Sequence, residues 1–551
     1  MRSFAGSIGL AIAAYYLWTA QSIRPFASDP ARLGYYELLA QGFAAGHLYL
    51  PITPPAELLA LPNPYDPAAN SRYRLHDAIL FRGRYYMLHL PGPAVALFLP
   101  WRLITRHDLP ENLALVLFCL GGFAFSTASL SRLLGRTDPW SVLALGLCTG
   151  IPFLLATVRM YEVAIGGGYF FVSAGIYFLL ANRFTASGIM FAFAIASRPQ
   201  LALVALAALI AIRLVKGRPL AFAIPVAAVG LLLAWYNYSR FGSIFEFGAR
   251  YQLSGIADNR LIPAAANLLP GLYYFLFSPP DFSAVFPFAR AVFRFPFGDS
   301  HWTLPPRYFL EPVIGALWQA PFLIAAAASR RLRPLAASAI AVLLFLVSIG
   351  FTTQRYEADF LPLLVWVSLA AIGNLRFRPI PILFGAIVSL ALAISGPYDN
   401  LLRNRPETYL RIAHVFSPIA RFRPALNPGF SAAFTAQFTP QPEHYREPLL
   451  TLGRQEFRYF LYAEHVAGKV RIASRQAESE IDCLIDPTRP AAFAVLYDPA
   501  ARTMHVSIDG QERITHPIAN LVTAPADETI AENRIDPNIT EPRFTGRITR
   551  P

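Results

Sequence analysis

The sequence predicts an all-α polytopic membrane protein with about eleven transmembrane helices, followed by a C-terminal all-β sandwich. The 551 residues are 55% hydrophobic and only 15% charged, with a mean hydropathy of +0.41. Soluble domains carry about 25% charged residues. Apolar runs of about 18 to 20 residues recur before residue 397, which is long enough to cross a bilayer. In the tail, apolar and polar residues alternate, as is typical of β-strands.

Eleven apolar segments are expected to cross the membrane, because most approach the roughly 20 residues that a spanning helix needs. They are residues 4–23, 112–131, 139–158, 163–182, 185–197, 200–212, 219–236, 309–329, 334–352, 359–374 and 379–396. Two further apolar stretches are expected to lie at the membrane interface or to re-enter it. These are residues 91–104, which are interrupted by Pro100, and residues 267–280.

The distribution of basic residues predicts the orientation in the membrane. With a cytoplasmic N-terminus, the short inner segments hold twelve Arg and Lys residues. The short outer turns then hold three, namely Arg159, Arg198 and Arg355. Positive residues concentrate on the cytoplasmic side of membrane proteins, so this orientation is favoured. No small-residue cleavage site follows the first run, so we interpret it as a retained helix rather than a signal peptide.

Two long polar segments, residues 24–90 and 237–308, interrupt the apolar runs and are expected to lie outside. Composition therefore divides the chain into a membrane domain over 1–396, a linker over 397–453 and an outer β-sandwich over 454–551. Period-two alternation of apolar and polar residues predicts the strands of the sandwich. It occurs in residues 454–466, 469–476, 492–498 and 503–510.

Several classes of function are disfavoured. The net charge of +13 comes mainly from arginines scattered between apolar runs, so we expect the lipid bilayer as a partner and no nucleic acid. Gly166-Gly167-Gly168 lies inside a span without a following lysine, and close helix packing explains it better than a phosphate loop. The three cysteines show no metal-ligand spacing and no disulfide framework. No GxSxG nucleophile elbow is present.

Three carboxylates in the first long loop are candidates for catalysis. Asp77 stands in RLHDAILFRGRYY, among basic side chains that could tune a general base, or it could be a solvated charge in a surface turn. Asp29 follows the first span and could instead cap the next helix. Glu37 lies one turn inside that helix, beside Tyr35 and Tyr36, and could belong to the polar face of an interfacial helix.

Charged and aromatic residues in the loops and at the outer ends of the spans are candidates for substrate binding. Charges near lipid are costly, so several at one level indicate a polar cavity facing outward, although interhelical ion pairs would also explain them. Arginine binds phosphate bidentately, so a lipid phosphate is a suitable ligand. The candidates are Arg74, His76, Arg84, Tyr85, Arg159, Glu162, Arg198, Arg250, Tyr251, Arg355 and Asp359.

The order of these features resembles the C-type (GT-C) membrane glycosyltransferases. These include the protein O-mannosyltransferases, the aminoarabinose lipid A transferases and the bacterial Rgt-like transferases. One span precedes a large outer loop that contains YYELLAQGFAAGHLYLP, and a body of many spans follows. The resemblance covers about residues 1–396 and rests on three segments: YDPAANSRYRLHDAILFRGRYYMLHLPGP, WYNYSRFGSIFEFGARYQL and QRYEADFLPLL.

The resemblance implies a polyprenyl-phosphate-linked sugar as donor, an outer-face active site and inversion at the anomeric carbon. It also assigns the catalytic base to a carboxylate of the first outer loop. Members often carry an acid shortly before the tyrosine of the first loop helix, whereas this chain has Arg32 there and Asp29 further back. We therefore rank Asp77 first, Asp29 second and Glu37 third. Some members use a divalent metal ion, and no ligand set in this sequence demands one.

The tail is similar to laminin-G and concanavalin-like sandwich modules over about residues 470–548. The similarity rests on AFAVLYDPAARTMHVSIDGQERI and ENRIDPNITEPRFTGRI, and such a module would suit sugar or polymer binding. We expect a glycosyltransferase of the bacterial inner (cytoplasmic) membrane, with a cytoplasmic N-terminus and both long loops and the tail outside. Its acceptor would be an envelope glycan, lipid or protein. Two alternatives remain open, a lipid-linked-sugar transporter or flippase and a non-catalytic carbohydrate-binding envelope protein.

Overall fold

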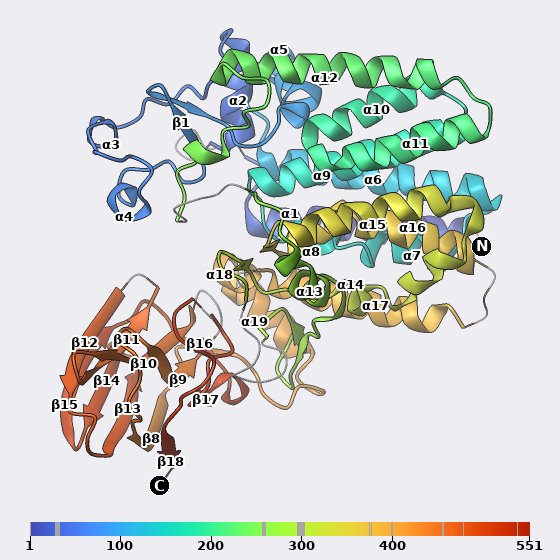
Figure 1. Ribbon diagram of the computed structural model, residues 1–551. Coiled ribbons are helices and arrows are strands. Elements are labelled where there is room, and N and C mark those ends of the chain that lie inside the picture. Colours follow the sequence, from blue (N-terminus) through green and yellow to red (C-terminus); the bar gives the residue numbers. More distant parts are fainter. Residues whose placement is uncertain are drawn as a thin grey trace. The chain divides into compact units, whose positions relative to one another are not determined.

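The computed structural model describes residues 2–27, 33–255, 261–294, 304–373, 375, 377–397, 400–453, 457–477, 479–536 and 538–550 (Figure 1). The chain forms two compact units. The first comprises Met1–Pro279, Pro305–Leu310 and Ile314–Ala393. The second comprises Pro280–Leu304, Glu311–Val313 and Ile394–Pro551. The second long loop, expected over 237–308, is thus divided between the two units.

Helices dominate the first unit. They are α1 (Arg2–Ile23), α2 (Tyr35–Ala44), α3 (Ala56–Leu59), α4 (Pro67–Asn70), α5 (Leu99–Thr105), α6 (Glu111–Leu134), α7 (Pro139–Leu147), α8 (Ile151–Leu155), α9 (Met160–Leu180), α10 (Phe184–Ser197), α11 (Ala202–Leu214), α12 (Pro219–Phe241), α13 (Leu268–Leu272), α14 (Ala316–Gln319), α15 (Arg333–Ser348), α16 (Leu361–Ile372) and α17 (Pro379–Ser395). Short 3-10 and π segments join them: η2 (Ala94–Phe98), η3 (Pro199–Leu201), η4 (Ala249–Tyr251), η5 (Ala265–Asn267), η6 (Tyr273–Phe277), η7 (Pro321–Ala328), η8 (Arg330–Leu332) and η9 (Gln354–Asp359).

Four helical runs are long and apolar enough to cross a membrane, namely α6, α9, α12 and the run that starts with α17 at Pro379. Helix α12 carries large apolar side chains on its surface: Leu220 and Leu231 are each 73% exposed and Trp235 is 58% exposed. An apolar surface of this kind is suited to lipid rather than to water. These are the properties of a membrane protein, as the composition predicts.

Some of the eleven expected spans are not single α-helices. Residues 139–158 divide into α7 and α8, because Gly150 between them has a φ of 74° and interrupts the helix. Residues 309–329 contain β5 (Phe309–Leu310), α14 and the 3-10 segment η7, which begins at Pro321. Proline lacks the N–H that an α-helix interior requires. Several other helices are shorter than the roughly 20 residues of a full span, so the number of spans stays a prediction.

Small residues allow α9 to pack closely against its neighbours, including α6 beside it (Figure 1). A Cβ added to Gly166 would lie 2.6 Å from the Leu115 side chain, and one added to Gly168 would lie 2.9 Å from Leu201. Membrane helices associate through such close approaches. The glycine run in this helix therefore serves helix packing, as predicted.

A hairpin in the first long loop joins that loop to the second. Strand β1 (Ile79–Phe81) pairs with β2 (Arg84–Tyr86) across a two-residue turn. The turn residues Arg82 and Gly83 have φ values of 50° and 69°, the left-handed conformation that tight hairpins require. Ile79 also forms an antiparallel bridge with Gln252. Residues far apart in the sequence are thereby brought beside residue 77.

The second unit contains two five-stranded sheets, in the orders β12-β11-β10-β9-β17 and β15-β14-β13-β8-β18. Leu461 of one sheet and Phe493 of the other belong to the same buried cluster, so the sheets pack face to face. The strands are β8 (Phe430–Gln437), β9 (Arg446–Leu452), β10 (Tyr459–Val466), β11 (Lys469–Gln476), β12 (Ser479–Ile485), β13 (Ala491–Asp498), β14 (Thr503–Ile508), β15 (Gln511–Pro517), β17 (Thr529–Ile530) and β18 (Arg547–Thr549).

The four alternating segments of the tail correspond to β10, β11, β13 and β14, as predicted, while residues 454–456 of the first segment lie outside the described residues. Strands β8 and β9 lie earlier, within the expected linker over 397–453, as do α18 (Asn400–Asn404) and α19 (Pro406–Val415). Every residue of β9 after Arg446 is buried, so this strand shows no alternation. Shorter strands complete the described part: β3 (Asp281–Phe282), β4 (Ala289–Arg290), β6 (Phe351–Thr352), β7 (Ala425–Leu426) and β16 (Val522–Thr523).

Candidate active site

Asp77, the first-ranked carboxylate, lies where the two long loops meet. Its backbone N–H donates to the Leu253 carbonyl oxygen at 2.6 Å, and the Leu253 N–H donates to the Ala78 carbonyl oxygen at 2.9 Å. Asp77 has a φ of 65°, a left-handed conformation that is uncommon outside glycine and is tolerated best by Asn and Asp. The paired backbone bonds hold this conformation. Backbone of this kind is concentrated at functional sites.

Both carboxylate oxygens of Asp77 are held by side chains from distant parts of the sequence. The Tyr161 hydroxyl, at the start of α9, donates to Oδ2, and Gln252 Nε2 donates to Oδ1 at 2.7 Å. His76 Nε2 lies 3.3 Å from Oδ2. The Asp77 side chain is 13% exposed and that of His76 is 61% exposed. The carboxylate is therefore oriented by the protein and remains partly accessible.

Tyr161 connects Asp77 with a second group of predicted residues. The guanidinium carbon of Arg355 lies 4.9 Å from the centre of the Tyr161 ring, which is a cation–π contact. Arg355 Nε lies 3.9 Å from Glu162 Oε1, and the two side chains are 13% and 3% exposed. The ring of His89 meets the Tyr161 ring edge to face, with centres 5.2 Å apart. A cation and an imidazole thus adjoin the tyrosine that orients the carboxylate.

His89 is half-buried, with its Nε2 inside the protein, and it lies close to two arginines. Burial, together with the charges of Arg198 and Arg355, lowers the pKa of His89 to about 3. The imidazole is therefore neutral near pH 7, with one donor and one acceptor nitrogen. Among the residues that the structure describes, its Nε2 has no hydrogen-bond partner. This nitrogen is able to bond a ligand hydroxyl without adding a charge.

Arg198 and Asp359 form a buried ion pair at the C-terminal ends of α10 and η9. Arg198 Nε lies 3.1 Å from both carboxylate oxygens, and its Nη2 also donates to Oδ2. Gln200 Nε2 adds a bond to Oδ2 at 2.8 Å. The Arg198 and Asp359 side chains are only 7% and 1% exposed. Such a fully bonded pair fixes the junction of the two segments.

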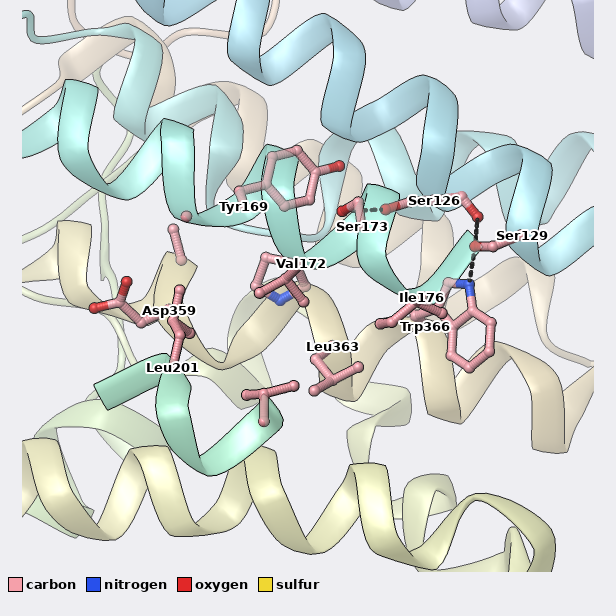
Figure 2. Close-up of a pocket in the computed structure, with 14 residues that line it drawn as sticks. Ser126, Ser129, Tyr169, Val172, Ser173, Ile176, Leu201, Asp359, Leu363 and Trp366 are labelled. Carbon is pink, nitrogen blue, oxygen red and sulfur yellow. Dashed lines mark hydrogen bonds between the residues drawn. The ribbon is translucent and has the colours of Figure 1, made fainter. Parts of the chain in front are cut away.

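Asp359 also lines a cavity of about 30 Å³ between the helices, shown in Figure 2. The Ser126 hydroxyl donates to Ser173 at 2.9 Å, and Trp366 Nε1 donates to Ser129 at 3.0 Å. A space of this size holds about one water molecule. The cavity is therefore too small for a sugar or a lipid headgroup.

Glu37 is buried at the contact between α2 and α6. Its Oε1 accepts the Glu111 backbone N–H at 3.1 Å, and Glu111 Oε1 accepts the Tyr36 N–H at 2.9 Å. Each carboxylate thus caps the first turn of the other helix, where unpaired N–H groups favour negative charge. Gly34 leaves space for this exchange, since an added Cβ would lie 2.2 Å from Glu111 Cδ. These bonds give Glu37 a structural role.

Other predicted residues stabilise the loops. Arg74 Nη1 donates to the Ser254 carbonyl oxygen at 3.1 Å and so ties the first loop to the second. The Tyr251 ring packs 4.8 Å from the Phe81 ring, between the same two loops. Tyr85 is buried at 1% exposure on strand β2. These side chains support the hairpin beside the carboxylate.

A last group lies nearer the surface. Arg250 Nη2 pairs with Glu246 Oε2 at 2.7 Å, with the arginine side chain 57% exposed. The Arg84 guanidinium lies 4.4 Å from the centre of the Tyr49 ring. Arg159 is exposed at the residue before α9. Asp29, the second-ranked carboxylate, lies outside the described residues.

Three residues of the site were not predicted, namely Tyr161, Gln252 and His89. Tyr161 precedes Glu162 at the outer end of an expected span, so its position in the sequence is a usable signal. His89 follows the hairpin closely and differs from its apolar neighbours. Gln252 carries no local signal, because only the folded chain brings the second loop to the first.

In the described part of the chain, no group of three His, Cys, Asp or Glu side chains is placed to hold a metal ion. The chemistry of the site is that of an oriented carboxylate near a cation. Such a pair can take a proton from a hydroxyl and stabilise a departing anion.

Comparisons with known proteins give no family for the chain. No protein-family model and no curated protein sequence matches it. The CBM40 module of the Ruminococcus gnavus IT-sialidase bound to α2,3-sialyllactose is similar, with 15% identity and a TM-score of 0.16. The match covers 22% of this chain and 76% of the module. The same module with α2,6-sialyllactose matches at 14% identity, a TM-score of 0.16, and 22% and 74% coverage.

Proposed function

We propose that the chain is a membrane glycosyltransferase of the C-type superfamily. It would transfer a sugar from a polyprenyl-phosphate donor to an envelope glycan, lipid or protein acceptor. One observation carries this proposal: the three segments on which the resemblance rests supply Asp77, Gln252 and Arg355 to one place, around Tyr161. If the sequence resemblance were accidental, there would be no reason for these three segments to lie together around a carboxylate.

In the proposed reaction, Asp77 is the general base. Its carboxylate takes the proton of the acceptor hydroxyl while the acceptor oxygen attacks the anomeric carbon of the donor. The bond between that carbon and the phosphate oxygen breaks, and the polyprenyl phosphate leaves with the bonding electrons. Tyr161 and Gln252 orient the carboxylate through their hydrogen bonds. A single displacement of this kind inverts the anomeric centre.

Arg355 is the cation best placed to stabilise the departing phosphate. It adjoins Tyr161, and its side chain is 13% exposed, against 7% for that of Arg198. His89 remains neutral at the pH of the reaction, so its ring can bond a sugar hydroxyl without repelling the arginine. The proposed roles therefore separate proton transfer, charge stabilisation and sugar positioning among three side chains.

The membrane topology is part of the same proposal. In addition to the four long apolar runs, shorter apolar helices such as α10, α15 and α16 cross the bilayer and give about eleven spans in all. The N-terminus lies in the cytoplasm, and both long loops and the β-sandwich lie outside, in the bacterial envelope. The excess of arginine and lysine in the short inner segments supports this orientation.

The test is sugar transfer by the full-length protein in lipid nanodiscs, over a panel of polyprenyl-phosphate sugars and envelope acceptors. Release of polyprenyl phosphate that requires both donor and acceptor would support the transferase. Binding of a donor without release would favour the non-catalytic carbohydrate-binding protein. Movement of a donor across a vesicle bilayer without sugar transfer would favour the flippase.

A further inference from the structure

A second cavity, of about 510 Å³, lies entirely within the second unit. The antiparallel pair β3 and β4 contributes one part of its lining, and the segment 526–543 contributes another. Pockets for small molecules typically measure roughly 300 to 1,000 Å³. The cavity therefore has the volume for one or two sugar rings, and none of the residues around Asp77 belongs to it.

Charged side chains dominate the lining. Arginines outnumber carboxylates, and both kinds are present: Arg290, Arg294, Arg534, Arg543, Asp281, Asp527 and Glu532. Arg290 lies at the less exposed part, where Nε is 3.2 Å from Asp281 Oδ2 and Nη2 is 2.9 Å from Asp527 Oδ1. The Asp527 side chain is completely buried there. One guanidinium thus holds two carboxylates in place, and this inner network fixes the shape of the cavity.

Two arginines are more accessible than this network. The side chain of Arg294 is 39% exposed, and its Nη2 lies 3.8 Å from Asp281 Oδ1 at the edge of the network. The side chain of Arg534 is 63% exposed, with a surface bond of 2.8 Å to Glu532. Guanidinium groups bind carboxylate and phosphate oxygens through paired N–H donors. The nearby carboxylates can accept hydrogen bonds from sugar hydroxyls. An anionic, hydroxyl-rich ligand fits both kinds of side chain.

Phe282 adds an apolar surface to the same cavity. It lines the cavity and is 55% exposed. Contact with water does not stabilise an apolar ring, so this side chain is available to pack against a ligand. The face of an aromatic ring packs well against the C–H face of a pyranose. Exposed aromatic side chains beside a few convergent polar groups are a feature of small-molecule sites.

We propose that this cavity binds an anionic saccharide, a sugar that carries a carboxylate or a phosphate. Arg294 and Arg534 hold the anionic group, the carboxylates accept bonds from hydroxyls, and Phe282 packs against the ring. The site is separate from sugar transfer and does not depend on it, because it acts by binding alone. The proposal assigns a class of ligand to the second unit, which the strand order of its sheets alone does not do.

The experiment measures binding to the full-length protein in detergent micelles, without any lipid donor. The probes are tri-galacturonate for the carboxylate class, mannose 6-phosphate for the phosphate class and neutral galactotriose as their control. The variants are Arg294→Gln, Arg534→Gln and Phe282→Ala. Arg513→Gln is the matched control, because Arg513 is an exposed arginine on β15 outside the cavity.

At least one anionic probe should bind at least about tenfold more tightly than galactotriose, and its identity names the anionic group. Loss of one charge-assisted bond should weaken that binding by about tenfold in Arg534→Gln and in Arg294→Gln. Arg513→Gln should bind as the unaltered protein does. Because Arg534 lies on the surface, Arg534→Gln should keep the melting temperature of the unaltered protein. Its affinity for the anionic probe therefore tests the proposal even if another variant unfolds.

Three results would overturn the proposal. One is that neither anionic probe binds. Another is that galactotriose binds as tightly as the anionic sugars. The third is that Arg534→Gln, with its fold intact, binds the anionic probe with unaltered affinity.

Discussion

The buried pair of Arg198 and Asp359 gives a prediction whose magnitude follows from the structure. The two side chains are 7% and 1% exposed, so solvent screens their interaction little. Asp359→Asn keeps the side-chain shape and an acceptor for Gln200, but it leaves a buried guanidinium without a carboxylate. Removing one partner of a buried pair costs about 3–5 kcal/mol. Asp359→Asn should therefore destabilise the first unit by about that amount.

A second substitution separates loss of the ion pair from loss of packing. In the double variant Arg198→Met with Asp359→Asn, no charge remains buried, and the methionine fills much of the arginine volume. Replacing both charges of a buried pair is often nearly neutral. The double variant should therefore recover at least about half of the stability that Asp359→Asn loses.

The assay is thermal unfolding in detergent micelles, followed by tryptophan fluorescence. At roughly 2 °C per kcal/mol for a unit of this size, Asp359→Asn should melt at least about 5 °C lower. Glu246→Gln is the control, because its partner Arg250 is 57% exposed and such pairs contribute about 0–1 kcal/mol. Melting of Asp359→Asn within about 1 °C of the unaltered protein would refute the reasoning. A double variant as unstable as the single one would refute it too.

Three further predictions concern the site and its surroundings. Tyr161→Phe removes one hydrogen-bond donor to the Asp77 carboxylate and should lower kcat for sugar transfer by about 10- to 100-fold. Tyr238→Phe on α12 is the control and should leave kcat unchanged. Equal kcat values for the two variants would exclude the positioning role of Tyr161. Glu37→Gln keeps an acceptor at the cap and should transfer sugar within about twofold of the unaltered rate, and a complete loss would identify Glu37 as the base. Burial lowers the pKa of His89 to about 3, so below pH 6.5 the unfolded chain binds a proton that the folded chain does not. The free energy of unfolding should therefore decrease as the pH is lowered from about 6.5 to 3, and His89→Asn should reduce this dependence on pH. An unchanged pH dependence of the free energy of unfolding, measured by denaturant titration, would contradict this assignment.

Composition and periodicity predicted the parts of the fold that depend on local sequence. Apolar runs identify α6, α9 and α12, because a lipid-facing helix must be apolar along most of its length. Alternation identifies β13, whose side chains are buried and exposed in turn. It misses β9, because burial on both faces removes the pattern.

Residues that act through contacts between distant segments were harder to predict. Asp77 stands out by its basic neighbours in the sequence, yet its bonded partners are Tyr161 and Gln252, at 84 and 175 residues away. No local pattern encodes such separations. For Glu37 the sequence suggests catalysis, because a carboxylate beside aromatic residues resembles a catalytic group. Only the folded structure shows that this carboxylate caps helix α6.

The central claim is that Asp77 is the base of a sugar transfer, and one comparison tests it most directly. Asp77→Asn and Asp66→Asn change neighbouring carboxylates in the same loop, but Asp66 caps the short helix α4 and Asn serves equally well there. Both proteins should bind a polyprenyl-phosphate sugar, and both should keep their melting temperature. We predict that Asp77→Asn loses release of polyprenyl phosphate by about 10²-fold or more, while Asp66→Asn keeps it. Equal release by the two folded variants would contradict the account.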